Sequence, residues 1–152
     1  MVTTTWRQGM TLLFGTAVAL LGAAVMVGWH LHIKPLLQIH PSFPLMQFNT
    51  ALGFLLSGLA CVALQQTRLR LAGGLAACVA LLGGLTLWQI TTGANLHIDQ
   101  LFMQPYATGK ESIPGRMAPN TALCFLLTGV TIGLLSSPLS AIVRNLFNSV
   151  LA

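Results

Sequence analysis

Long apolar stretches alternate with short polar segments along the chain. The stretches 9–29, 48–65, 71–92 and 119–135 contain no formally charged residue. A helix that crosses a bilayer needs about 20 predominantly apolar residues, and each stretch comes close to that length. The pattern therefore predicts an all-α membrane protein with four transmembrane helices. The first stretch could instead be a secretory signal, but it is longer than a signal core and no clear cleavage site follows it.

The second half of the chain repeats the first. Residues 46–58 read MQFNTALGFLLSG, and residues 117–129 read MAPNTALCFLLTG. Upstream, HLHIKPLL at 30–37 parallels NLHIDQLF at 95–102, and VALLG occurs at both 18–22 and 79–83. The repeated unit is thus a whole helix-loop-helix.

We therefore divide a single transmembrane domain, 1–152, into repeat one at 10–65 and repeat two at 71–136. Two units of the same orientation predict a parallel repeat with an approximate two-fold axis along the membrane normal. Equivalent residues of the two units should then face one another. The remaining segment, 139–152, predicts an amphipathic helix or the start of a fifth membrane helix.

Composition supports the membrane assignment. Apolar residues make up 55% of the chain and charged residues 6%, with a mean hydropathy of +0.79, which argues against a water-soluble globule. The formal charge of +5 is spread singly along the chain, so it does not form a nucleic-acid-binding face. The three cysteines lie in apolar runs and indicate neither a disulfide framework nor a metal motif.

The positions of the basic residues predict the topology. One side of the membrane would carry Arg7, Arg68, Arg70 and Arg144, and the other Lys34, Lys110 and Arg116, diluted by Asp99 and Glu111. Basic residues in short turns favour the cytoplasmic side. We expect a multi-pass protein of the bacterial inner membrane with both termini in the cytoplasm. The loops 30–47 and 93–118 would then face outward.

Polar residues at the outer helix starts are the first candidates for a site. Asn49-Thr50 and Asn120-Thr121 open the second and fourth spans at equivalent places. Each Asn could cap its helix by accepting first-turn N–H groups. Alternatively, the two amides could line an outward-facing pocket or bond across the helix interface. Asp99 and Arg116, in the second outer loop, complete the candidate ligand-binding set.

The histidines suggest a second kind of site. His32 and His97 occupy equivalent positions in the two repeats, so a symmetric fold could bring both rings to a haem or metal ion. The other interpretation is that they bond to loop backbone or lipid headgroups at the membrane interface, where Trp29 and Trp88 would form an aromatic belt. No catalytic set can be assembled from this sequence.

The sequence resembles a known family over most of residues 10–136. The segments GANLHIDQLF and PGRMAPNTALCFLLTG, with the signatures at 98–102 and 115–127, are similar to the N-terminal multi-span module that precedes PAS domains in bacterial sensor histidine kinases and in some diguanylate cyclases. The resemblance implies a membrane sensory input module of a two-component or similar signal-transduction protein. Kinase or cyclase activity would belong to a parent chain.

Three other functions remain open at this stage. The chain could be a haem- or metal-binding redox protein that uses His32 and His97, a transporter half, or a small structural subunit of a membrane complex. The transporter is the weakest of these, because no span contains a charged residue that would mark a substrate route. The expected partners of a sensor module are the lipid bilayer, further copies of the chain in a homo-oligomer, and an unidentified small ligand.

Overall fold

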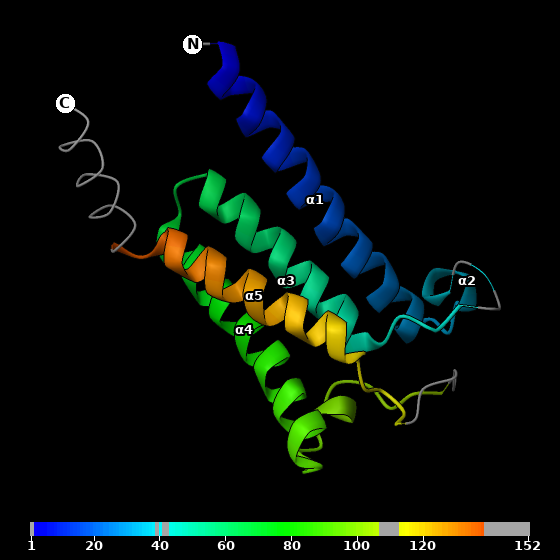
Figure 1. Ribbon diagram of the computed structural model, residues 1–152. Coiled ribbons are helices and arrows are strands. Elements are labelled where there is room, and N and C mark those ends of the chain that lie inside the picture. Colours follow the sequence, from blue (N-terminus) through cyan, green and yellow to red (C-terminus); the bar gives the residue numbers. More distant parts are fainter. Residues whose placement is uncertain (1, 39, 41–42, 107–112, 139–152) are drawn as a thin grey trace.

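The computed structural model describes residues 2–38, 40, 43–106 and 113–138 (Figure 1). Throughout these residues the regular elements are helices. The four long ones are α1 (Val2–His30), α3 (Phe48–Gln65), α4 (Leu69–Thr92) and α5 (Pro119–Ser136). A short helix α2 (Lys34–Leu37) and a 3₁₀ helix η1 (Ile98–Gln100) lie in the two long loops. The predicted helix at 139–152 falls outside the described residues.

The prediction of four apolar helices is confirmed. All four long helices are long and apolar enough to cross a membrane. Two begin before the predicted spans, α1 at Val2 and α4 at Leu69, because a helix continues past the charged residues that limit its apolar part. Only 22% of the most apolar window of α1 is buried within the protein. Large apolar side chains cover the outside of the bundle, as a bilayer environment requires.

The helices pack as two pairs. Helix α1 packs against α3, and α4 packs against α5, while α3 also contacts α4 and α5 and thereby joins the pairs. Both long loops leave the bundle at the end where α3 and α5 begin, and the short α3–α4 turn lies at the opposite end (Figure 1). Each pair corresponds to one sequence repeat.

Equivalent glycines make the same close contact in the two pairs. A Cβ atom on Gly22 would lie 2.4 Å from the carbonyl oxygen of Ala51, and one on Gly83 would lie 2.4 Å from that of Ala122. Real Cβ atoms do not come this close to a backbone oxygen, so only glycine allows these helix separations. Small residues at such crossings are typical of helix pairs in membranes.

The two repeats also meet at equivalent aromatic residues. Phe54 of α3 and Phe125 of α5, which align in the repeat, have ring centroids 5.4 Å apart and planes at 77°. This edge-to-face geometry is favourable for aromatic pairs. At this position the expectation that equivalent residues face one another is confirmed.

Candidate functional site

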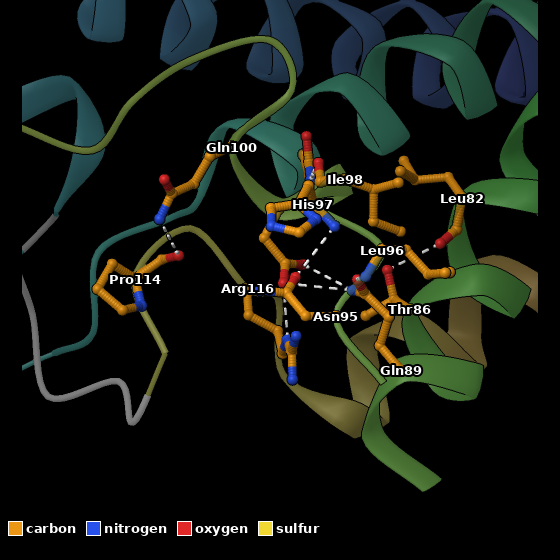
Figure 2. Close-up of polar contacts among 12 residues, drawn as sticks. Leu82, Thr86, Gln89, Asn95, Leu96, His97, Ile98, Gln100, Pro114 and Arg116 are labelled. Atoms are coloured by element: carbon orange, nitrogen blue, oxygen red, sulfur yellow. Dashed lines mark hydrogen bonds and ion pairs between the residues drawn. The ribbon is translucent and has the colours of Figure 1, made fainter. Parts of the chain in front are cut away.

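A buried polar cluster fixes the second of the two long loops, which we call the outer loops after their predicted orientation, to α4. The Asp99 carboxylate accepts a bond of 2.8 Å from Arg116 Nε and bonds of 3.1 and 3.2 Å from Gln89 Nε2 (Figure 2). Asp99 is 6% exposed and Gln89 is fully buried. The Oε1 atom of Gln89 accepts the N–H of Leu96 at 2.7 Å. A carboxylate this deeply buried needs such partners. Asp99 and Arg116 therefore form a buried ion pair that stabilises the loop.

The turn before Arg116 requires a glycine. Gly115 has φ of +84°, in the region that side chains of L residues rarely adopt. A Cβ atom there would lie 2.6 Å from the carbonyl oxygen of Asp99. Because Gly115 allows both this φ and this close approach, the backbone of the turn lies against η1 and Arg116 lies beside Asp99.

The first outer loop is fixed by Trp29. Its ring is 1% exposed, and its Nε1 donates to the carbonyl oxygen of Met46 at 2.9 Å. It packs in an apolar cluster with Val25, Leu37 and Phe48. The prediction of an aromatic belt was therefore wrong for Trp29, because the loop folds back over the ring. Trp88 is 59% exposed, in keeping with a belt position.

The two outer loops contact each other. Asn49 Nδ2, at the start of α3, donates to the carbonyl oxygen of Ile98 in the second loop at 2.9 Å. The ring of Tyr106 packs on Trp29 and His32, with centroid distances of 5.1 and 4.1 Å. The described parts of the loops 30–47 and 93–118 therefore contact each other and form one joint surface.

A cavity of about 340 Å³ lies between these loops and the starts of α3 and α5. Three of the predicted site residues line it, namely Thr50, Arg116 and Thr121. Gln47, which the sequence did not single out, lines it too. Gln47 is 4% exposed, and its Oε1 atom has no hydrogen-bond partner among the described residues. We refer to this space as the outer cavity.

The asparagines do not act as the equivalent pair that was expected. The N-cap positions of α3 and α5 are Gln47 and Ala118, and neither makes a side-chain cap bond. Asn49 is 1% exposed, and its side chain donates to a loop carbonyl of the other repeat rather than capping α3 or bonding across a helix interface. Asn120 is exposed, and its Oδ1 accepts the N–H of Thr121 at 3.0 Å. It therefore does satisfy a first-turn amide.

The equivalent histidines share a backbone conformation. His32 and His97 are exposed non-glycine residues at φ of 58° and 57°, a left-handed conformation in which histidine is enriched. The repeated LHI sequence thus places a left-handed histidine at the equivalent position of both repeats. Across the described ranges, no group of three or more His, Cys, Asp or Glu side chains could hold a metal ion. The haem or metal function remains a prediction.

No protein-family model, curated protein sequence or solved structure matches this chain.

Proposed function

We propose that this protein is a membrane sensory input module of a bacterial signal-transduction protein, with the outer cavity as its ligand site. The observation that carries the proposal is Gln47, a cavity-lining residue whose buried Oε1 has no hydrogen-bond partner among the described residues. Leaving a buried acceptor unsatisfied costs about 1–3 kcal/mol. A ligand that donates a hydrogen bond to this oxygen, after a rotation of the Gln47 side chain toward the cavity, would remove that cost.

The lining defines the chemical class of ligand. The Oε1 atom of Gln47 requires a hydrogen-bond donor on the ligand. The Nε of Arg116 is held by Asp99, but its other N–H groups favour an acceptor or an anionic group on the ligand. The rest of the wall is largely apolar and includes Leu37, Phe43 and Leu45. A small molecule with a donor and an acceptor on an apolar body fits this arrangement.

The position of the outer cavity offers a route for the signal. Gln47 and Thr50 belong to repeat one, and Arg116 and Thr121 belong to repeat two. A bound ligand would therefore bridge the two helix pairs. It would displace them only if it binds two arrangements with different affinities. In our proposal the outer loops face away from the cytoplasm, the protein forms a homo-oligomer in the inner membrane, and the displacement reaches an output domain of the parent chain.

A library of small amphipathic compounds tests the binding step. The protein in lipid nanodiscs is screened for compounds that raise its unfolding temperature, and the hits are repeated with Gln47→Leu. We expect Gln47→Leu to abolish the shift and Gln66→Leu to retain it, because Gln66 is an exposed residue at the other end of α3. Hits that are indifferent to Gln47→Leu would contradict the site.

The sensory step needs its own measurement. Spin labels at Gln66 and Ser136, at the inner ends of α3 and α5, report the distance between the two repeats. A compound that binds through Gln47 should change that distance distribution. If a compound binds and the distance distribution does not change, the protein binds a ligand without a conformational response. That result would contradict the sensory function.

A further inference from the structure

A second, larger hollow lies within the membrane-spanning part of the bundle. It has a volume of about 720 Å³ and lies between α1, α3 and α5, within the range of ligand sites. Its walls include the repeat-equivalent pairs Phe54 and Phe125, and Ser57 and Thr128. Phe54 and Thr121 border both hollows. We call the larger one the membrane groove.

Ser57 of the groove wall has an unused hydroxyl. The residue is 7% exposed, and its Oγ has no hydrogen-bond partner in the described part of the chain. By contrast, the hydroxyls of Thr86 and Thr131 donate to the carbonyl oxygens four residues earlier, at 2.9 and 2.7 Å. Lipid tails offer no partner to a polar group at this depth. A groove occupant with a polar atom would supply one after a rotation about the Ser57 side-chain bond.

The remaining lining restricts the occupant further. Phe14, Phe54 and Phe125 line the groove, and the last two form the edge-to-face pair. Among the described residues, no charged side chain lines it. An anionic or cationic headgroup would therefore be buried without a counter-charge, which is strongly unfavourable. Aromatic walls instead favour a flat, neutral ring.

We propose that the membrane groove binds a neutral lipid-soluble molecule that consists of a flat ring with carbonyl oxygens on an apolar chain, the chemistry of the isoprenoid quinones. A ring carbonyl accepts the hydrogen bond of Ser57, and the ring packs on the phenylalanine side chains. The apolar chain lies along α1 toward the lipid. This proposal does not rest on a ligand in the outer cavity, although the two hollows share Phe54 and Thr121.

Decylubiquinone is a suitable probe. Its binding to the full chain in nanodiscs of saturated phosphatidylcholine is measured by titration, with decylbenzene as a matched molecule that lacks carbonyl groups. We expect saturable binding of decylubiquinone alone. Ser57→Ala should raise its Kd about tenfold, the effect of losing one hydrogen bond, whereas Ser136→Ala, whose hydroxyl donates to Gly133, should leave the Kd unchanged.

Filling the groove gives a second, independent readout. Cys124 lines the groove and its neighbour Leu123 does not, although both are exposed on α5. Cys124→Phe should abolish binding, while Leu123→Phe should retain it. Equal binding of decylbenzene would show that any apolar chain fills the groove, and an unchanged Kd in Ser57→Ala would show that the hydroxyl does not bind the probe. Either result would overturn the proposal. The proposal would also be overturned if decylubiquinone did not bind and Cys124→Phe changed the oligomeric state, because the groove would then be a contact between copies.

Ser57→Ala also separates a ligand role from a structural one. Without the probe, this variant should be at least as stable as the natural protein, because it removes a buried polar group that lacks a partner. A marked loss of stability in the absence of the probe would mean that the hydroxyl supports the fold, and the proposal would fall.

Discussion

Asp99 and Arg116 form the ion pair on which the second outer loop depends. Their side chains are 5% and 13% exposed, and the pair is shielded further by Gln89. The two charged residues could be found in the sequence as candidates for a site. Gln89 could not, because a single glutamine near the end of an apolar helix shows no periodic or compositional signal. Its role depends on which loop residue folds back beside it.

Removing one member of the pair should be severe. Arg116→Leu leaves the Asp99 carboxylate buried without its counter-charge, so we expect the free energy of unfolding to fall by about 3–5 kcal/mol. Reversible unfolding in mixed detergent micelles measures the change. Combining Arg116→Leu with Asp99→Asn should recover a large part of the loss, since the amide is neutral. A double variant no better than Arg116→Leu would contradict a charge-based explanation.

At the scale of the helices, close contact at glycine sets the geometry of each pair. Gly58 repeats the contact of Gly129, with hypothetical Cβ atoms 2.4 and 2.6 Å from the carbonyl oxygens of Gly15 and Ala76. The sequence repeat indicated which helices pair. Only the packing shows which face of each helix meets its partner. A Cβ atom added to Gly74 or Gly133, in the same spans, would have no neighbour within 4 Å.

Matched alanine substitutions test this difference. Gly83→Ala forces a methyl group against the Ala122 carbonyl, and we expect a loss of about 1–3 kcal/mol in stability from the resulting overpacking. Gly133→Ala, where nothing lies within 4 Å of the added atom, should be neutral or slightly stabilising because alanine favours a helix. The free energy of unfolding of both variants is measured under the same conditions. An equal change in both would mean that the helices at Gly83 can move apart to accept the methyl group.

At the scale of the whole molecule, the two long loops gather at one end of the four helices (Figure 1). If all four helices cross the membrane, both loops lie on the same side of it. The basic turn at Arg68 and Arg70 lies at the opposite end. Close-in positive charges favour the cytoplasm, so we predict that the outer cavity opens to the outside.

Cysteine labelling in intact cells tests this orientation. In a background without the natural cysteines, a cysteine at Leu101, which is 65% exposed in the second loop, should react with a membrane-impermeant maleimide. A cysteine at Thr67, in the α3–α4 turn, should react only after the cells are opened. The reverse pattern would invert the topology and place the outer cavity in the cytoplasm.

The sequence alone determined the all-α class, the four apolar helices and the pairing of helices by repeat. These features follow from local composition and from similarity along the chain. It also singled out Thr50, Arg116 and Thr121, and these three residues line one cavity in the structure. Tertiary structure decided that Asn49 joins the repeats while Asn120 stays exposed.

Tertiary structure likewise decided which polar atoms are buried without partners. Gln47 and Ser57 are ordinary residues in the sequence, and their importance depends on contacts with segments far away in the chain. Hydrogen-bond satisfaction is a property of the folded surroundings, since a polar side chain acquires its partners only when distant elements pack. For this reason a sequence repeat shows which positions correspond, whereas only the packing decides which corresponding residues make the same contacts.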